Sequence, residues 1–471
     1  MSINTILIIV STLVIVISCF IMYFRAKGRK QIVYTEDFST IEKVLEGVKQ
    51  DMVDIVKEDT TVGTDEEFEK RFKRKARIND ALKKCVFGID SAKMLVIDLI
   101  RDFIDENVED EHIDKMLGLD EDSEPSDHIM FEILMYRYKR RYGKDALAKW
   151  IEKNNFDRER VAEDSNRIQD KAFYITVEDL QQSYLEENIK LSQDEKRDVL
   201  AVLVYQLYKG FGIVDTLREM NINGFNMGTS GSILSAVNNT KNTLNRANNS
   251  IWLYYNGKYI HLRFMNFGNE DELRRIIQLL IRYNNPGSLT AKRGYLVNTM
   301  YDKSRILALR PPASEYWAIF IRKFNLSDQS PEYLINKPYT HKAELCIKLI
   351  EYLMRGHITC AVTGRQGSGK TTMMSAIIRY IDPKYTIRVL EMAPELYLRE
   401  LYPTRNILSV QETQTVSAAE LQDALKKSDA AVSIVGEVAT DAIAARMIQM
   451  GMTASCDTFP TKRIQRLGLC A

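Results

Sequence analysis

The sequence predicts an α/β protein with several parts, and three observations lead to this fold class. The last third of the chain alternates short apolar runs, typical of buried parallel strands, with helical stretches. The middle of the chain mixes strand and helix patterns, and the residues before it show helical spacing of apolar positions. At 471 residues the chain is long enough for two or three domains with separate cores.

The first element is a stretch of 20 uncharged, mostly apolar residues from Thr5 to Phe24. As a helix it would span about 30 Å, the thickness of a bilayer core, so we predict a single transmembrane anchor over residues 1–24. A basic cluster follows it directly: Arg25, Lys27, Arg29 and Lys30. By the positive-inside rule this cluster places the remaining chain in the cytoplasm, at the cytoplasmic membrane. A cleaved signal peptide is disfavoured because no positive charge precedes the apolar stretch, and a lipoprotein site because Cys19 lies inside it.

Residues 25–195 are predicted to form a mostly helical region of unassigned role. Its acidic cluster between residues 105 and 127 is typical of a solvated loop or helix end. The basic run between residues 71 and 77 favours a solvated helix face, with contact to anionic lipid or nucleic acid as the alternative. The formal net charge of +1 gives no general attraction to nucleic acid.

Residues 196–330 are predicted to be a smaller α/β domain. A helix through Leu200 and Leu207 is closed by Gly210, and a strand from Ile251 to Tyr255 turns at Asn256–Gly257. A polar stretch with two prolines, 331–340, is the predicted linker. A third domain, 341–471, begins with a helix from Ala343 to Met354.

The third domain contains a complete G-x-x-x-x-G-K-T phosphate loop. It lies between an apolar run, Ile358 to Val362, which we predict to be a buried strand, and a helical run that begins at Thr372. Backbone N–H groups of such a loop surround phosphates, the lysine reaches the β- and γ-phosphates, and the threonine holds Mg²⁺. We therefore predict ATP and Mg²⁺ as cofactors. The predicted binding residues are Gly364, Arg365, Gln366, Gly367, Ser368, Gly369, Lys370, Thr371 and Thr372.

Two acidic residues follow apolar runs in the same part of the chain. Glu437 ends the run that begins at Ala430, and Glu391 ends the run that begins at Tyr385. Because ligands of open α/β sheets bind at the carboxyl ends of parallel strands, both carboxylates are expected beside the phosphate loop. We predict that Glu437 organises the hydrolytic water, that Glu391 supports the metal or the water, and that Lys370 belongs to the catalytic set.

These motifs resemble the secretion ATPases of type II, type IV and tight-adherence pilus systems, most closely the tight-adherence pilus branch. The likeness covers about residues 196–460. Besides the phosphate loop, the matching elements are Val389–Leu390–Glu391 through Glu395, Gly436–Glu437–Val438, Asp302–Lys303–Ser304–Arg305, Arg310–Pro311–Pro312 and Ile321–Arg322–Lys323–Phe324.

The resemblance implies a RecA-like P-loop NTPase domain with the smaller α/β domain packed over its nucleotide. It further implies a homohexameric ring whose ATP hydrolysis powers pilus assembly or protein secretion. Its expected partners are an inner-membrane platform and pilus or secretion proteins, with no nucleic acid. Three arginines of the smaller domain are, by this resemblance, candidates for phosphate contact: Arg305, Arg310 and Arg322.

Three positions depart from the family pattern. Met392 stands where the pilus branch has Asp, Ala439 replaces Arg, and Pro460 stands at the expected histidine. We expect from this and from the short ending that the C-terminus is truncated or frame-shifted. The alternatives are a catalytically weakened nucleotide-binding scaffold and a nucleic-acid-translocating RecA-like ATPase, which the balanced charge disfavours.

Overall fold

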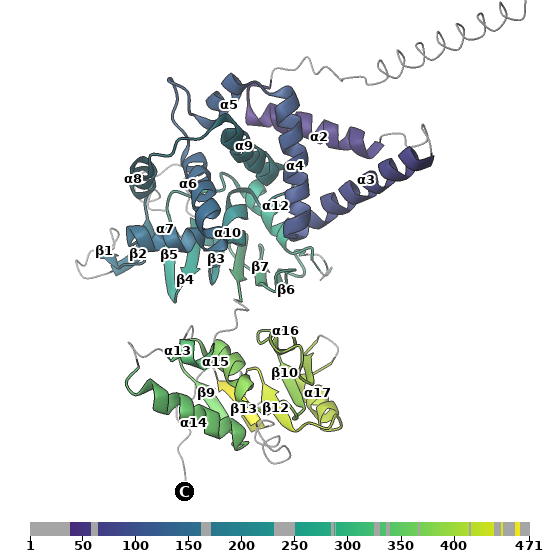
Figure 1. Ribbon diagram of the computed structural model, residues 1–471, viewed down its shortest axis with the longest axis vertical. Coiled ribbons are helices and arrows are strands. Elements are labelled where there is room, and N and C mark those ends of the chain that lie inside the picture. The colour runs from purple at the N-terminus through teal and green to yellow at the C-terminus, as the bar shows by residue number, and fades with distance from the viewer. Residues whose placement is uncertain are drawn as a thin grey trace, which may run out of the picture.

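The computed structural model describes most of the chain between residues 38 and 461, in two units. The described residues are 38–57, 65–161, 171–229, 250–283, 287, 289–324, 330–335, 340–365, 368–413, 416–437, 444–445 and 457–461. Figure 1 shows the first unit, from α2 to β8, above the second, from α13 to β13. The predicted anchor at residues 5–24 lies outside the described residues. Within the described residues, no helix combines the length and the apolar character that crossing a membrane requires.

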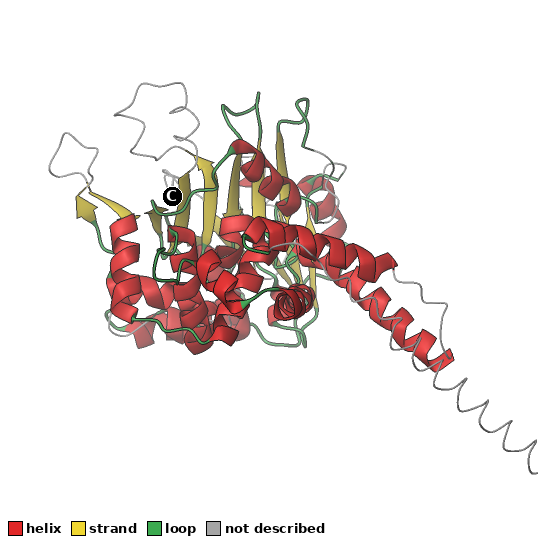
Figure 2. Ribbon diagram, turned by 90° about the horizontal axis from the view of Figure 1, so that it is seen from above, coloured by secondary structure: helices red, strands yellow, loops and turns green. Residues whose placement is uncertain are grey.

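The first unit is built from helices on a large sheet. Figure 2 shows most of these helices gathered on one side of the strands. Its helices are α2 (Ile41–Lys57), α3 (Asp65–Lys84), α4 (Asp90–Asn107), α5 (Asp110–Leu117), α6 (Asp127–Tyr142), α7 (Ala146–Asn154), α8 (Val177–Glu187), α9 (Gln193–Tyr208), α10 (Asp215–Glu219) and α12 (Glu270–Leu280), with short 3₁₀ turns at Cys85–Phe87, Gly143–Asp145 and Gly212–Val214. Its strands are β1 (Arg160–Val161), β2 (Lys171–Ile175), β3 (Gly224–Thr229), β4 (Ser250–Tyr255), β5 (Lys258–Leu262), β6 (Tyr295–Thr299), β7 (Arg305–Leu309) and β8 (Ala318–Arg322).

In the part of the chain that the structure describes, the sheet of the first unit has eight strands in the order β1-β2-β5-β4-β3-β8-β7-β6. All neighbours are antiparallel except β2 and β5. Residues alternate between buried and more exposed along β6 and β7, as expected for a sheet with one face on the core. The predicted turn at Asn256–Gly257 joins β4 to β5, and both residues have positive φ.

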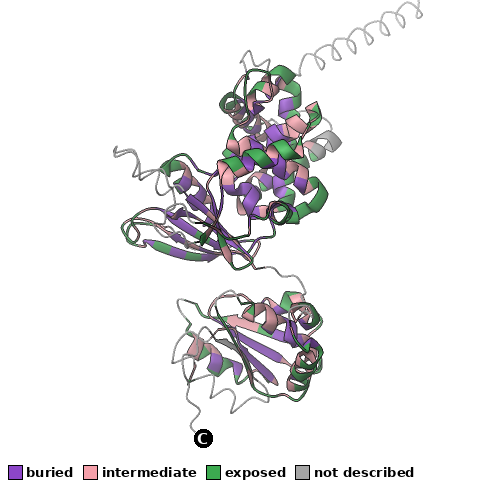
Figure 3. Ribbon diagram, turned by 90° about the vertical axis from the view of Figure 1, so that its left-hand side faces the viewer, coloured by how far each residue is buried: buried purple, intermediate pink, exposed green. Residues whose placement is uncertain are grey.

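Two hydrophobic clusters hold the first unit together. One joins α6 and α7 to the inner face of the sheet through side chains such as Phe131, Trp150 and Ile260, and the other joins α2–α5 to α9 through Val96 and Leu200. Figure 3 shows these buried residues along the strands and the inward sides of the helices. The domain boundary expected between residues 195 and 196 falls inside α9. This helix belongs with the helices before it, since its side chains are part of their hydrophobic cluster. The region 25–195 also contributes β1 and β2 to the sheet.

The second unit is a parallel sheet with short helices. The five strands that lie within the described residues have the order β11-β10-β12-β13-β9, and every neighbouring pair is parallel. The predicted linker 331–340 contains a helical turn, α13, whose Glu332 accepts a hydrogen bond from Tyr380 at 2.5 Å. The elements are α13 (Pro331–Leu334), α14 (Ala343–Arg355), β9 (Cys360–Thr363), α15 (Lys370–Ile377), a 3₁₀ turn at Ile378–Tyr380, β10 (Ile387–Glu391), α16 (Leu398–Leu401), β11 (Ile407–Gln411), α17 (Ala418–Leu425), β12 (Val432–Val435) and β13 (Asp457–Thr461).

The strand that leads into the phosphate loop differs from its prediction. It begins at Cys360 rather than Ile358, and it is not buried, since Ala361 and Thr363 are exposed and Ile358 is 50% exposed. The physical reason is its place at the edge of the sheet, where only β13 pairs with it among the described strands. The predicted buried strand before Glu437 is present as β12, and the predicted strand that leads to Glu391 is present as β10, which includes Glu391; every residue of both strands is buried.

Candidate nucleotide-binding site

The phosphate loop ends at the start of α15, as its sequence predicts. Gly369 precedes the helix with φ of 82°, a left-handed conformation that L side chains rarely adopt. No side chain of the described residues caps this end, and the backbone N–H of Met373 is the one that returns to the carbonyl of Gly369, at 2.8 Å. The N–H groups of the first turn are therefore directed at the loop, where the positive end of the helix dipole favours an anion.

The lysine of the loop folds back over the loop backbone. Lys370 Nζ donates to the carbonyl oxygens of Gly364 at 3.0 Å and Arg365 at 2.7 Å. The N–H of Ser368 donates to the carbonyl of Arg365 at 3.2 Å, which closes the turn. A cation held above a helix N-terminus in this way forms a site for phosphate oxygens. Gln366 and Gly367, also predicted to bind, lie outside the described residues.

Thr371 and Thr372 begin the helix beside Lys370, and both are half-buried. The hydroxyl of Thr371 is the kind of oxygen that Mg²⁺ accepts next to phosphates. Among the described residues, no group of three or more His, Cys, Asp or Glu side chains is placed to hold a metal ion. Beside phosphates, Mg²⁺ generally takes oxygens from the nucleotide together with one or two from the protein.

The two predicted acidic residues lie at the same edge of the sheet as the loop. Strands β9, β10 and β12 are parallel, so the residues after them emerge together at their carboxyl ends. Glu437 is half-buried and is separated from the end of β12 only by Gly436. This placement suits a carboxylate that orients a water molecule near the phosphates.

Glu391 is arranged differently from Glu437. Its side chain is buried, at 4% exposed, and its Oε1 accepts hydrogen bonds from the backbone N–H groups of Glu395 at 2.9 Å and Leu396 at 3.0 Å. Burial raises the pKa of this carboxyl, and the two N–H groups offset the rise only in part. Gly436 makes room for it, since a Cβ at that position would lie 2.7 Å from Glu391 Cγ. One oxygen of the predicted metal ligand is thus already committed to the protein backbone.

The three candidate arginines lie in three different settings. Arg305 Nη1 pairs with Glu395 Oε1 at 2.7 Å, which connects the first unit to the second. Arg310 stacks over Trp317 with its guanidinium carbon 4.9 Å from the ring centre, inside the first unit. Arg322 lines a hollow of about 460 Å³ together with Arg305 and Ala393. The structure therefore brings Arg305 and Arg322 to the boundary between the units and leaves Arg310 on its own unit.

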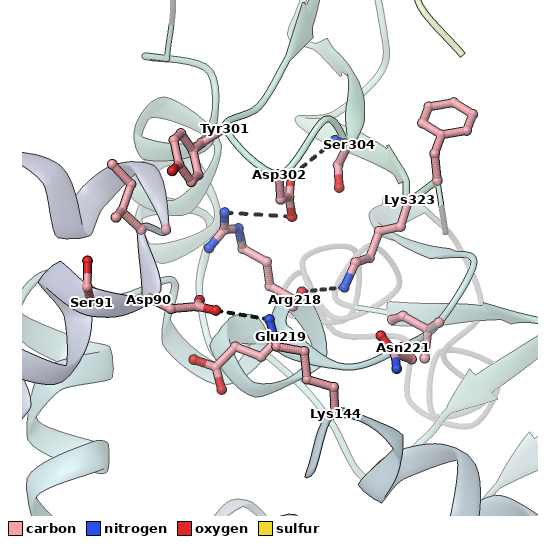
Figure 4. A pocket seen from close by; sticks show the side chains of 14 residues that line it. Asp90, Ser91, Lys144, Arg218, Glu219, Asn221, Tyr301, Asp302, Ser304 and Lys323 are labelled. Atoms are coloured by element: carbon pink, nitrogen blue, oxygen red, sulfur yellow. Dashed lines mark hydrogen bonds and ion pairs between the residues drawn. The ribbon is translucent and has the colours of Figure 1, made fainter. Parts of the chain in front are cut away.

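The matched element at residues 302–305 forms the hairpin turn between β6 and β7 and the start of β7. Figure 4 shows the pocket behind it, about 440 Å³, in which Asp302 accepts from the backbone N–H of Ser304 at 3.0 Å and faces Arg218 at 3.8 Å. Lys323 lies in the same pocket and donates to the carbonyls of Arg218 and Met220, both at 2.5 Å. Burial lowers the pKa of Lys323 to about 8. Lys323 thus stabilises the end of α10 rather than facing the phosphate loop.

The sequence analysis did not predict the contacts that Lys303 makes between the units. Lys303, which lies in the matched element 302–305, contacts both Tyr397 and Glu400 of the second unit, and these two residues belong to no matched element. Gly436 was noted only as part of a signature, whereas the structure shows it as the space into which Glu391 packs. The glycine directly before Glu437 could have indicated that another side chain approaches the backbone closely at this strand end.

Comparisons with known proteins find solved structures but no family model and no curated protein. One similar structure is the VirB11 ATPase of the Brucella suis type IV secretion system in complex with sulphate. The two sequences are 17% identical, and the match covers 51% of this chain and 71% of the VirB11 chain with a TM-score of 0.23. A second is the Legionella pneumophila ATPase DotB, which is 15% identical. That match covers 53% of this chain and 63% of the DotB chain with a TM-score of 0.37. A third is the pilus retraction motor PilT with bound ADP, at 17% identity, 53% and 66% coverage and a TM-score of 0.37.

These structural neighbours are secretion and pilus ATPases by name, and the narrower tight-adherence branch receives no support from them. The chain spans less than two thirds of the DotB and PilT chains. At these identities and TM-scores the likeness carries no argument about activity.

Proposed function

We propose that this chain binds Mg²⁺ and ATP at the loop from Gly364 to Thr371 and hydrolyses the nucleotide. The observation that carries the proposal is the start of α15, where N–H groups without a side-chain cap and Lys370 converge on one loop. Lys370 holds phosphate oxygens, Thr371 supplies a metal ligand, and Glu437 orients the water. The bound metal ion would neutralise charge on the phosphates.

The wider proposal is a membrane-anchored motor that powers pilus assembly or protein secretion as a homohexamer. Its support is the set of sequence elements shared with the secretion ATPases, two of which the structure brings to one boundary at Arg305 and Glu395. Residues 5–24 would anchor it in the cytoplasmic membrane, and an inner-membrane platform with pilus or secretion proteins would be its partners.

Binding is tested by titration calorimetry with ATPγS and Mg²⁺ on the parent and on Lys370→Ala. Loss of a charge-assisted contact to phosphate is expected to weaken binding about tenfold to a hundredfold. The matched control is Lys384→Ala, which removes an exposed lysine of the same unit that pairs with Asp382 at 3.2 Å. Equal affinity in Lys370→Ala and the parent, or no binding by the parent, would contradict the proposal.

One observation favours a second candidate, a nucleotide-gated scaffold without turnover. Pro460, at the position where the resembling family has histidine, lies in β13 and pairs with Val362 of β9, next to the loop. Proline has no group that can titrate or donate a hydrogen bond there. Turnover measured beside binding separates the candidates: an ATPase loses turnover but keeps binding in Glu437→Gln, whereas a scaffold binds ATP and shows no turnover in the parent.

A further inference from the structure

Two turns, one from each unit, meet at the boundary between the units. Lys303 Nζ of the β6–β7 turn pairs with Glu400 Oε1 at 2.8 Å, and Arg305 at the start of β7 pairs with Glu395 at 2.7 Å. The Tyr397 hydroxyl donates to the carbonyl of Lys303 at 3.2 Å. The ring of Tyr397 also lies 5.4 Å from Lys303 Nζ. The contact therefore combines two ion pairs, one hydrogen bond and one cation–π contact.

The centre of this contact is formed by two residues with unusual backbone conformations. Lys303 has φ of 67° and Tyr397 has φ of 45°, and neither is glycine. A left-handed conformation is unfavourable for a residue other than glycine, so each turn needs other interactions that hold it. Both turns have such interactions, and they come from within their own units.

The turn of the first unit is held from behind by the pocket in Figure 4. The N–H of Ser304 donates to Asp302, and the N–H of Met300 donates to the carbonyl of Ser304 at 2.8 Å. Arg218, at 7% exposed, faces the carboxylate of Asp302. This side of the contact is shaped without any residue of the second unit.

The turn of the second unit is held by Glu391. Its buried carboxylate accepts the N–H groups of Glu395 and Leu396, and therefore fixes the backbone on which Glu395 and Tyr397 are carried. Hydrogen bonds to a buried charged group contribute more to stability than ion pairs that are partly exposed to solvent. The side chains of Lys303 and Glu400 are 38% and 48% exposed. The turn that Glu391 holds is therefore the more stable element, and the contact between the two units forms and breaks more easily.

We propose that Glu391 is a positioning residue: it folds the segment from Glu391 to Tyr397 into the shape that docks onto the β6–β7 turn and fastens the two units together. This differs from the metal role expected from the sequence. The two roles require different properties of the side chain. Positioning requires an oxygen that accepts two N–H groups, which a glutamine carbonyl also supplies, whereas a metal ligand requires the negative charge.

Docking is measured in the full chain without nucleotide by a zero-length carbodiimide crosslink between Lys303 and Glu400, quantified by mass spectrometry. Neither of these residues touches Glu391, and the readout does not depend on ATP binding. The crosslink between Lys258 and Asp157, which are 2.7 Å apart within the first unit, is the internal reference. Hydrogen exchange of β10 and β12 shows that the second unit is folded.

Four variants are compared with the parent. Glu391→Gln should keep the crosslink, and Glu391→Ala should lower its yield about tenfold. Gly436→Ala places a Cβ 2.7 Å from Glu391 Cγ and should lower it as well, with Glu391 still present. Glu420→Ala is the matched control, because that carboxylate accepts the N–H of Ser417 at 2.8 Å elsewhere in the same unit. An undiminished crosslink in folded Glu391→Ala, or an equal loss in Glu391→Gln, would overturn the proposal.

Discussion

The two units differ in how completely they bury their apolar side chains. The first unit has two extensive clusters that join helices from distant parts of the chain to one sheet. Among its described residues the second has one small cluster around Met374 and Ile434, and its helix α14 leaves Leu345, Leu349 and Tyr352 at 60%, 59% and 71% exposed. The candidate nucleotide site therefore lies in the unit with less packing, as is usual for loops that must rearrange around a ligand.

The comparison is most sharply tested in the core of the first unit. Phe131 is fully buried and its ring contacts Trp150 and Phe264, so Phe131→Ala should lower the free energy of unfolding by about 4 kcal/mol. Urea unfolding followed by hydrogen exchange of the first unit measures the loss. The control is Leu185→Ala, at a position 75% exposed, which should change stability by less than about 0.5 kcal/mol. Such truncations in a packed core cost about 3–5 kcal/mol of unfolding free energy. A loss of less than about 1 kcal/mol in Phe131→Ala would show that Phe131 is not packed as described.

A buried ion cluster in the same unit gives the next largest effect. Lys93 pairs with Asp215 and Glu219, and Lys139 pairs with Glu219 at 3.0 Å. Burial alone would raise the pKa of Glu219, but the nearby ammonium groups outweigh it and hold that pKa well below its usual range. Lys93→Met leaves two carboxylates short of a cation and should cost about 3 kcal/mol.

The control for the ion cluster is Lys49→Met, which breaks an exposed pair with Glu46 and should cost about 0.5 kcal/mol or less. Chemical denaturation at pH 7 compares the two variants. Equal losses would show that the cluster around Lys93 is no more stabilising than a surface pair.

The first unit should also lose stability in acid through a buried histidine. His261 stacks on Trp252 at 4.4 Å, and burial, helped by Arg263, lowers its pKa from 6.5 to about 4. Because the folded state prefers the neutral ring, His261 contributes its full stabilisation above pH 6.5, the ordinary pKa of histidine. This contribution to the free energy of unfolding is lost as the pH falls toward 4.

The contribution of His261 between pH 7 and pH 5 is about 2 kcal/mol. His261→Gln should remove that part of the acid sensitivity of the first unit. Denaturation midpoints of parent and variant at the two pH values measure it, and parallel pH profiles would show that His261 does not titrate as described.

The smallest expected effect is in the phosphate loop of the second unit. A Cβ at Gly369 would meet nothing within 4 Å, so Gly369→Ala should cost only backbone strain, about 1 kcal/mol. Gly369→Asn should cost less, because asparagine tolerates the left-handed region better than alanine. Thermal unfolding of the second unit, followed by hydrogen exchange, ranks the two. Alanine tolerated better than asparagine would show that another feature controls this position.

Prediction from the sequence succeeded where short-range pattern decides the structure. The strands before Glu391 and Glu437, the helix after Lys370 and the turn at Asn256–Gly257 all follow from apolar periodicity or turn chemistry. It missed β13, which contains Pro460, and it missed the strand β2 within a region of helical pattern. Those strands depend on partners that are distant in the sequence.

The amino-acid sequence by itself determined the phosphate loop, since residue types at fixed spacing specify where the backbone can surround phosphates and where the lysine stands. It also indicated the helix that follows the loop and the strands that end at Glu391 and before Glu437. Only the tertiary structure decided what Glu391 and Arg305 contact, because those contacts join a buried strand end to its own following turn and a hairpin of one unit to a loop of the other. Contacts between distant segments depend on the three-dimensional packing, and local periodicity contains no information about them.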